Sequence, residues 1–321
     1  MKKINVLVTG IGTIIGYGII NSLRHSKYDV HIVGMDMNKN AVGKHWCDEF
    51  VVAEPAASEK YINFLKETID NYHIDLVLLG IEQDMNKISD CRDELGHYLD
   101  KIVINKKNII DLTNDKWLTY QFLSENGFPA IESTLENRFE ELMSFFGGSF
   151  LVKPRQSYSS RGIKKIQDRL TFDYYKQLLG DQFMAQRIIG DDDHEYTAAA
   201  FGYGDGSASE PIVLKRRLSF EGSTLTAEVV DSKIIEDSIR RLTKLLKPVG
   251  PTNFQYRIEN NKAFLLEINP RVSSSTSMRY AFGFNEAEMA IEFYLNHNRI
   301  EHPIIKKGKA VRYISDYIEL L

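Results

Sequence analysis

Short apolar runs alternate with helical patterns in the N-terminal part of the chain. The runs that favour buried strands cover residues 4–9, 30–35, 50–53, 76–79 and 102–104. A helical pattern follows the first run as far as Leu23, and another covers residues 58–72. Strands that alternate with helices predict a parallel, doubly wound sheet. We therefore expect an α/β domain over residues 1–112.

A β-hairpin is predicted nearer the C-terminus. Polar and apolar residues alternate over 253–258, turn residues follow at 259–262, and a second apolar run covers 263–268. Glu267 stands inside that second run, where a carboxylate is costly to bury without a neighbouring cation. Asn269 lies two residues further on, so its side chain shares a face with that of Glu267. Such an oxygen-rich face suits Mg²⁺, although an edge strand with one solvated face would show the same alternation.

Further strand and helix patterns lie outside these two regions. Strands are predicted at 150–155, 163–166, 183–190 and 212–218, and helices at 116–126, 232–246 and 286–295. Asn114 or Asp115 can cap the helix at 116–126. The strand at 212–218 carries Lys215, Arg216 and Arg217. In a cleft these cations would serve phosphates or an anionic substrate, and on an outer face they would be solvated.

Composition and charge narrow the classes of function. Hydrophobic residues make up 43% of the chain and charged residues 26%, and the net charge is −4 with dispersed Lys and Arg. A nucleic-acid-binding protein would favour a basic face, so we expect no nucleic-acid partner. Cys47 and Cys91 have no metal-type spacing and are expected to be reduced. Without a bilayer-length apolar run or a signal-peptide pattern, we expect a cytoplasmic protein with no membrane partner.

A glycine-rich turn follows the first predicted strand. It contains Gly10, Gly12 and Gly16. Their spacing is one residue longer than the dinucleotide-binding fingerprint, and Asp36 could stand for the ribose-binding acid, so an NAD(P) oxidoreductase is one hypothesis. The alternative is a tight strand-to-helix turn that uses glycine for its geometry alone. Glu82 and Asp84 follow a later strand, where such a sheet presents ligands, although solvated acids are common there.

Lys153 lies near the end of the predicted strand at 150–155, and a loop of small polar residues follows at 156–162. The backbone N–H groups of such a loop and the charge of the lysine can cradle phosphates. The alternative is a hairpin turn with scattered basic residues. An acidic turn at 191–195 includes His194 and resembles a metal cluster. Adjacent side chains splay apart, however, so a solvated turn is favoured there.

Several of these segments together resemble the ATP-grasp enzymes, and most closely the carbamoyl-phosphate synthetase large-chain type. Phe254-Gln255 followed by Glu267-Ile268-Asn269-Pro270-Arg271 is similar to the metal-binding signature of that family. The run at 269–276, Asn-Pro-Arg-Val-Ser-Ser-Ser-Thr, is a specific part of the match. The segment from Lys153 to Gly162 resembles the family's phosphate lid, except that Ser157 and Ser159 stand where glycine is usual.

The resemblance implies a fold and a division of the chain. The N-terminal domain would be followed by an ATP-grasp fold of two subdomains. Residues 113–185 would form a small subdomain with the phosphate lid, and residues 186–321 a large subdomain with the metal site. In this family the N-terminal domain forms one wall of the acceptor-substrate site.

The resemblance also implies an ATP site. The residues matching the family's phosphate-binding positions are Lys116, Lys153, Ser157, Ser159, Ser160, Arg161 and Gly162. Those matching the adenine connector are Gln186, Arg187 and Ile188, although the family more often has Glu at the position of Gln186. Glu195 is the expected ribose-binding acid, with Asp193 as the second choice.

The implied reaction is carboxylate activation. Mg²⁺ or Mn²⁺ would be held by Glu267 and Asn269 with Gln255 assisting, and the catalytic residues would be Arg271, Lys153 and Asn269. ATP would convert a small carboxylate into an acyl phosphate that an amine or related nucleophile opens. An ATP-grasp kinase or a non-catalytic ATP-binding regulator is the alternative. Carbamoyl-phosphate synthesis itself is not expected, because the synthetase large chain resembles two ATP-grasp halves and this chain has one. The expected assembly is a monomer or a homodimer.

The metal hypothesis predicts the register of the hairpin. Gln255 and Glu267 can share a metal only if they lie on one face of the antiparallel pair. A regular two-residue turn at Asn260-Asn261 would instead send Glu267 to the opposite face. The hypothesis therefore requires a three-residue loop or a bulge. It also predicts that Phe254, Leu266 and Ile268 turn toward the core.

Overall fold

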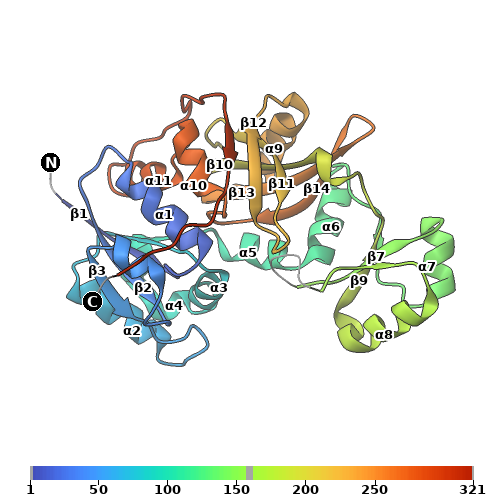
Figure 1. The fold of residues 1–321 in the computed structure, drawn as a ribbon, viewed down its shortest axis with the longest axis horizontal. Coiled ribbons are helices and arrows are strands. Elements are labelled where there is room, and N and C mark those ends of the chain that lie inside the picture. The colour runs from blue at the N-terminus through green and yellow to red at the C-terminus, as the bar shows by residue number, and fades with distance from the viewer. Residues whose placement is uncertain (1–2, 157–161, 320–321) are drawn as a thin grey trace.

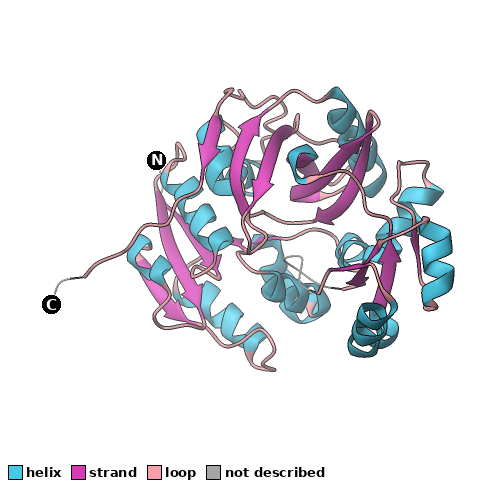
Figure 2. Cartoon of the chain, turned by 45° about the vertical axis from the view of Figure 1, so that its right-hand side comes forward, coloured by secondary structure: helices cyan, strands magenta, loops and turns pink. Residues whose placement is uncertain are grey.

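The computed structural model describes residues 3–156 and 162–319, which form three sheets in separate lobes (Figures 1 and 2). The sheets have five, six and four strands. Short 3₁₀ helices cover Val42–Trp46, Gly96–Lys101, Gly180–Gln182, Asp192–His194 and Tyr280–Phe282. No helix within the described ranges is both long and apolar enough to cross a membrane.

The N-terminal domain is a parallel sheet covered on both faces, as the alternating pattern predicted. Its strands are β1 (Ile4–Thr9), β2 (Val30–Asp36), β3 (Glu49–Val52), β4 (Leu76–Leu78) and β5 (Ile102–Val103), in the order β3-β2-β1-β4-β5. Its helices are α1 (Ile14–Arg24), α2 (Tyr61–Asn71), α3 (Glu82–Asp90), α4 (Arg92–Leu95) and α5 (Lys107–Asn114). Successive residues of β1 alternate between two cores, since Val6 packs with α1 and Leu7 with α2.

The small lobe is an antiparallel sheet that lies to the right in Figure 1. Its strands are β6 (Ser133–Thr134), β7 (Phe150–Pro154), β8 (Lys164–Ile166) and β9 (Phe183–Gln186), in the order β6-β9-β7-β8. Two helices, α7 (Phe139–Phe146) and α8 (Arg169–Leu179), contribute Leu142 and Phe172 to its core. The other face of β7 and β9 is therefore left to face the large lobe.

The large lobe is built on the six-stranded sheet. Its strands are β10 (Glu195–Tyr203), β11 (Ile212–Leu218), β12 (Thr224–Val229), β13 (Val249–Glu259), β14 (Lys262–Asn269) and β15 (Lys309–Val311), in the order β14-β13-β10-β11-β12-β15. Its helices are α6 (Lys116–Glu125), α9 (Lys233–Leu246), α10 (Thr276–Arg279) and α11 (Glu286–Tyr294). Leu123 of α6 packs into the core beneath α9, so this helix supports the large sheet. Asp115 caps α6 by accepting from the N–H of Trp117 at 2.8 Å, as predicted.

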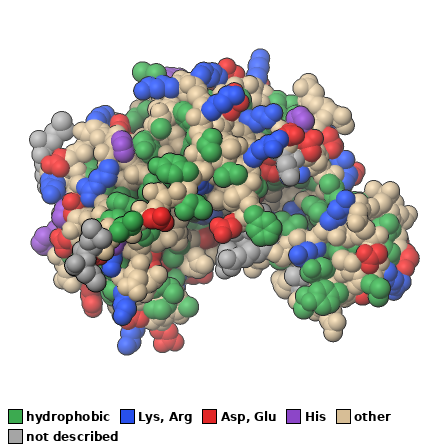
Figure 3. Space-filling view, in the orientation of Figure 1, with side chains coloured by type: hydrophobic (Ala, Val, Ile, Leu, Met, Phe, Trp, Pro, Cys, Tyr) green, Lys and Arg blue, Asp and Glu red, His purple; other side chains and the backbone are tan. Residues whose placement is uncertain are grey.

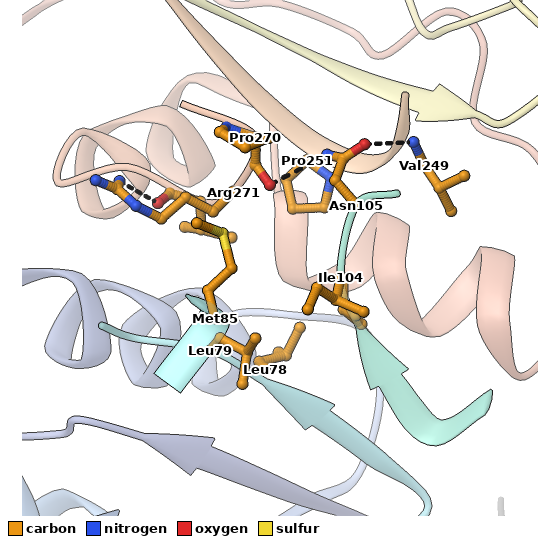
Figure 4. A pocket seen from close by; sticks show the side chains of 11 residues that line it. Leu78, Leu79, Met85, Ile104, Asn105, Val249, Pro251, Pro270 and Arg271 are labelled. Atoms are coloured by element: carbon orange, nitrogen blue, oxygen red, sulfur yellow. Dashed lines mark hydrogen bonds between the residues drawn. The ribbon is translucent and has the colours of Figure 1, made fainter. Parts of the chain in front are cut away.

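Asn105 joins the N-terminal domain to the large lobe (Figure 4). Its buried side chain donates to the carbonyl of Pro270 and to the hydroxyl of Thr252, both at 3.1 Å. Its carbonyl oxygen accepts from the N–H of Val249 at 2.8 Å. These hydrogen bonds hold the C-terminal end of the hairpin, just before Arg271, against the carboxyl ends of the parallel strands.

Candidate active site

A cavity of about 430 Å³ lies between the small lobe and the large lobe. It brings together predicted site residues from separate segments of the chain: Lys116, Lys153, Gln186, Arg187, Ile188, Glu195, Gln255 and Glu267. Its apolar walls come from residues that the sequence did not single out: Ile131, Leu151, Ile163, Ile189, Leu218 and Leu266. Apolar walls with a few convergent polar groups are typical of a small-molecule site.

The hairpin places Gln255 and Glu267 on one face of the sheet. Asn260 and Asn261 form a two-residue turn with φ values of 49° and 56°. Gln255 is nevertheless paired with Glu267, because the register shifts immediately after Gln255 and Tyr256 pairs with Leu265. The bulge required by the metal hypothesis is therefore present.

The bulge also corrects one prediction. Phe254 and Ile268 are buried in the core, as expected, but Leu266 is partly exposed and lines the cavity. Leu266 is the extra residue of the bulge, and Leu265 takes the core position. The bulge thus adds an apolar side chain to the cavity wall.

Two lysines approach the cavity from different lobes. Lys153 is 6% exposed, and its Nζ donates to Gln186 Oε1 at 2.7 Å. Gln186 in turn donates to the hydroxyl of Ser133 at 2.9 Å, which fixes its amide. Burial, together with the charge of nearby Lys116, lowers the pKa of Lys153 to about 7, and the charge of Glu267 opposes this shift. Lys116 is likewise partly buried beside the cavity, so it is not simply a solvated helix lysine.

The predicted ribose-binding acid is held by two arginines. Arg216 donates to Glu195 Oε1 at 2.9 Å and to Gln255 Oε1 at 2.8 Å. Arg257 donates to Glu195 Oε2 from Nε at 3.2 Å and from Nη2 at 2.9 Å. Glu195 thus lies on the cavity wall with its charge compensated, and its ribose role stays a prediction. Asp193 is exposed and forms an ion pair with Arg217.

Arg216 and Arg257 were missed as site residues. Arg216 is 6% exposed, whereas Lys215 is partly exposed and Arg217 exposed. Alternation along β11 sends neighbouring side chains to opposite faces, which explains why one cation of the three turns inward. The sequence shows this alternation. It does not show which face of the strand lines a cleft, because that depends on the tertiary fold.

The oxygen atoms around Glu267 fit a hard cation. Glu267 lines the cavity, and its carboxylate accepts no hydrogen bond from any residue in the described ranges. Asn269 is 7% exposed and shares the face of Glu267, with its Oδ1 accepting from Arg271 at 3.2 Å. Gln255 shares this face, but its Oε1 already accepts from Arg216. A free carboxylate beside an amide oxygen and two lysines suits Mg²⁺ carried with phosphates.

The acidic turn after β9 behaves as a solvated turn. His194 Nδ1 lies 2.7 Å from Asp191 Oδ1, and both side chains are exposed. Within the part of the chain that the structure describes, no three His, Cys, Asp or Glu side chains gather as a metal cluster.

Arg271 connects the hairpin to the N-terminal domain. Its Nη2 donates to Glu82 Oε2 at 2.8 Å. Glu82 forms this bond, and Asp84 is only 3% exposed. The interpretation of these two residues as solvated loop acids is therefore wrong. Burial raises the pKa of Asp84 to about 6, and the nearby hydroxyl groups of Thr9 and Tyr61 oppose this shift. The sequence could not reveal the pairing because Glu82 and Arg271 are 189 residues apart.

The glycine-rich turn is accounted for by its own geometry. Gly10 has φ +60°, and a Cβ on Gly16 would lie 2.3 Å from the carbonyl oxygen of Gly10. Asp36 accepts from the N–H of Gly12 and from the N–H of Asn38, each at 2.8 Å, so it ties the glycine-rich turn to the loop after β2. These contacts favour the tight-turn interpretation over a dinucleotide site.

The predicted lid lies largely outside the described residues. Ser157, Ser159, Ser160 and Arg161 lie outside the described residues, so their phosphate-binding roles stay predictions. Gly162 is described, with φ +78° and a position where a Cβ would lie 2.8 Å from Pro154 Cγ. This close approach requires glycine at the end of the loop.

Comparison with known proteins agrees with this geometry. The family described as "ATP-grasp in the biosynthetic pathway with Ter operon" matches residues 193–317. The carbamoyl phosphate synthase large chain of Methanocorpusculum labreanum is 22% identical over 90% of this chain, which spans 30% of that protein. A D-alanine–D-alanine ligase from Baumannia cicadellinicola is 25% identical over 54% of this chain, which spans 55% of that enzyme.

Solved structures show the same fold. N5-carboxyaminoimidazole synthetase from Staphylococcus aureus, complexed with ADP, superposes with a TM-score of 0.75 at 15% identity, covering 97% of this chain and 82% of that one. The biotin carboxylase domain of Hydrogenobacter thermophilus 2-oxoglutarate carboxylase, with MgADP, ADP and bicarbonate, gives 0.71 at 13% identity, covering 95% and 73%. Residues 193–317 therefore match an ATP-grasp family, and the solved structures show that the chain has the ATP-grasp fold, in agreement with the inter-lobe cavity and the hairpin signature.

Proposed function

We propose that this protein is an ATP- and Mg²⁺-dependent ligase that joins a small carboxylate to an amine or related nucleophile through an acyl phosphate. The observation that carries the proposal is the cavity lined by buried Lys153, partly buried Lys116 and Glu267, whose carboxylate accepts no hydrogen bond from the described residues. Cations that would hold phosphates thus lie opposite oxygens that would hold a metal, as a bound metal–nucleotide requires.

In this proposal the cavity walls hold the nucleotide. The adenine lies against the apolar residues beside the connector at 186–188, and Lys116 and Lys153 contact the phosphates. Glu267 and Asn269 would hold Mg²⁺, with Gln255 joining them if it leaves Arg216. The metal would neutralise charge on the β- and γ-phosphates.

The chemistry proceeds in two displacements. A carboxylate oxygen attacks the γ-phosphorus, the bond to the β-phosphate oxygen breaks, and ADP leaves. The nucleophile then forms a bond to the acyl carbon, the carbon–oxygen bond to phosphate breaks, inorganic phosphate leaves, and the proton lost by the nucleophile passes to solvent. The protein supplies no nucleophile, so catalysis is positioning and electrostatic stabilisation, with Arg271 holding the acyl phosphate.

The similar proteins do not identify the carboxylate or the nucleophile that this protein would use. The chain spans less than two thirds of the length of the curated relatives described above, so their complete activities are not carried over. Lys, Arg, Asp and Glu are interspersed on the face drawn in Figure 3, in keeping with small-molecule substrates and no nucleic acid.

A panel assay tests the proposal. The protein is incubated with Mg-ATP, a set of carboxylic acids and a set of amines, and ADP, phosphate and coupled products are measured. We expect ADP and free phosphate to form in equal amounts, with release stimulated by one acid–amine pair. A stable phosphorylated product would indicate a kinase instead. Binding of ATP without turnover over the panel would favour a regulator, and tight NADH binding without ATP binding would overturn the ATP site.

A further inference from the structure

A second cavity, of about 530 Å³, lies at the junction between the N-terminal domain and the large lobe. Its walls come from the N-terminal domain between Arg92 and Lys106, from Val249 at the start of β13, and from the end of α11 with the loop that follows. Among the described residues, it shares no lining residue with the cavity between the small and large lobes. Its volume is within the usual range of small-molecule sites. A ligand of this cavity would therefore be distinct from the nucleotide.

The second cavity combines an apolar wall with basic side chains. Ile102 and Ile104 are buried and form the apolar wall together with the partly buried ring of Phe293. The basic residues that line the cavity are Arg92, Lys106, His297 and Arg299. Asp100 is the one carboxylate among the described residues that line it. An apolar wall beside an excess of positive charge suits an anion that carries an apolar body.

Arg92 is a partly buried guanidinium that forms no ion pair with a described carboxylate. Its Nη2 donates to the backbone carbonyl of Asn105, its Nε is buried without a hydrogen-bond acceptor, and its Nη1 donates to no residue in the described ranges. Burial lowers the pKa of Arg92, and Tyr294 and Asp111 oppose this shift. Asp111 itself pairs with Lys107 at 2.9 Å. Because a desolvated cation is costly without a counter-ion, an anion in the cavity would stabilise Arg92.

Lys106 brings unused donors to the same cavity. Its Nζ donates to the carbonyl of Gly204 at 2.9 Å, and no carboxylate of the described residues pairs with it. An ammonium has three N–H donors, so this single hydrogen bond leaves two for a ligand. The next residue, Lys107, contrasts with it, because its Nζ pairs with Asp90 at 3.0 Å and with Asp111 at 2.9 Å. The lysine that lines the cavity is thus the one without a carboxylate.

The loop after α11 adds two basic side chains to the cavity. His297 has φ 57°, a left-handed conformation that is uncommon for residues other than glycine. Arg299 follows it and pairs with Asp205 at 2.9 Å, and its guanidinium lies 5.0 Å from the centre of the Tyr203 ring. Arg299 is therefore held in place and contributes mainly its field. The donors left for a ligand belong to Arg92 and Lys106.

We propose that the second cavity binds a small organic anion, a carboxylate or phosphate monoester with an aromatic or branched apolar body. The anionic group accepts hydrogen bonds from Arg92 Nη1 and Lys106 Nζ, and the body packs against Ile104 and Phe293. Arg92 donates to the carbonyl of the residue that precedes Lys106, so the two cations border the same stretch of backbone. The site lies apart from the proposed ATP cavity, and the inference does not depend on the ligase function.

Calorimetric titration of the full chain with four small probes tests the site. Phenyl phosphate and benzoate carry both an anionic group and an apolar ring, inorganic phosphate lacks the ring, and benzyl alcohol lacks the charge. Each titration is made with and without a saturating non-hydrolysable Mg-ATP analogue, which fills the nucleotide cavity. We expect phenyl phosphate or benzoate to bind about tenfold or more tightly than inorganic phosphate and benzyl alcohol, with or without the analogue. The tighter of the two anions identifies the ligand as a phosphate monoester or a carboxylate.

Variants of the two cations locate the bound anion. Lys106→Gln and Arg92→Gln should each weaken binding of the tighter anion by about tenfold or more, and should change affinity for the Mg-ATP analogue by less than about twofold. Lys107→Gln, which removes the neighbouring paired lysine, is the matched control and should change neither affinity. Arg92 also supports Asn105, so circular dichroism and thermal unfolding check each variant. If Arg92→Gln does not fold, Lys106→Gln alone decides the comparison.

Four results would overturn the inference. The first is no saturable binding of phenyl phosphate or benzoate at millimolar concentrations. The second is binding that the Mg-ATP analogue abolishes, because the anion would then occupy the nucleotide cavity. The third is affinity for inorganic phosphate or benzyl alcohol equal to that for the ring-bearing anions, which would remove one half of the predicted ligand. The fourth is unchanged affinity in Lys106→Gln, which would show that the cations of this cavity do not hold the anion.

Discussion

Lys153 Nζ donates a 2.7 Å hydrogen bond to the neutral amide of Gln186, and no carboxylate within the described ranges forms an ion pair with this buried ammonium. Burial without a counter-ion disfavours the charged form of a lysine. The pKa is accordingly lowered to about 7 from an ordinary value of 10.5, and Lys116 contributes to the shift. Glu267, across the cavity, is the group that opposes it.

The first prediction is that ATP binding takes up a proton near neutral pH. Triphosphate favours the charged lysine, so affinity should fall as pH rises above about 7. The unfolded chain holds this proton more tightly, so Lys153 should also make the free protein more stable as pH rises from about 7 toward 10.5. Calorimetric titration with Mg-ATP in phosphate and in Tris buffer measures the uptake directly.

Gln186→Glu provides the control for proton uptake. A carboxylate at this position would pair with Lys153 and raise its pKa, because an opposite charge favours the protonated amine. The variant should therefore bind ATP with little proton uptake near neutral pH. Equal binding enthalpies in the two buffers for the unaltered protein would contradict the prediction.

The second prediction concerns the charge of Lys153 in binding and in folding. Lys153→Met should weaken ATP binding by roughly 1.5–3 kcal/mol, as expected for a lost charge-assisted hydrogen bond. It should not lower the free energy of unfolding appreciably, since the buried ammonium is itself costly. Lys165→Met, at an exposed position of β8, is the matched control. A large loss of stability with unaltered ATP affinity would show that Lys153 is structural.

The pattern of apolar residues and the geometric requirements of a metal site predicted several elements of this fold. The apolar run at 4–9 and the strand pattern at 212–218 predicted β1 and β11 with the bounds that the structure has. The need to place two metal ligands on one face predicted either a three-residue loop or a bulge, and the structure has the bulge, between Gln255 and Tyr256. Both inferences use information carried by neighbouring residues or by a single hairpin.

Contacts between segments that are far apart in the sequence could not be predicted from these local patterns. The sequence favours a solvated acid at Glu82 because its partner, Arg271, lies far away in the chain. Glu195 was predicted as a ribose ligand, but the two arginines that bind its carboxylate were not predicted. Leu266 was predicted to lie in the core, whereas it lines the cavity. In each case the environment of the side chain is set by tertiary packing, which the sequence pattern does not encode locally.

The third prediction concerns the junction between the N-terminal domain and the large lobe. Asn105→Leu removes three hydrogen bonds and leaves the N–H of Val249 and the carbonyl of Pro270 without this partner. We expect the free energy of unfolding to fall by about 2–4 kcal/mol, since each buried unsatisfied group costs about 1–3 kcal/mol. Urea unfolding measures it. Asn108→Leu, at an exposed position of α5, should have little effect, and equal behaviour of the two variants would contradict the role of Asn105.

The fourth prediction uses the free carboxylate of Glu267 to test the metal site. With Mg²⁺ present, Glu267→Gln should weaken ATP binding on the order of tenfold, because it removes a charged metal ligand. Without metal, the same change removes a negative charge from a cavity that must receive phosphates, so metal-free ATP should bind equally well or more tightly. This opposite response distinguishes a metal ligand from a structural residue, whose loss would weaken both forms of binding. Titration of Mg-ATP and of ATP with EDTA measures the two responses, with Glu228→Gln, at a half-exposed position of β12, as the control. Equal weakening of both forms would remove Glu267 from the metal site.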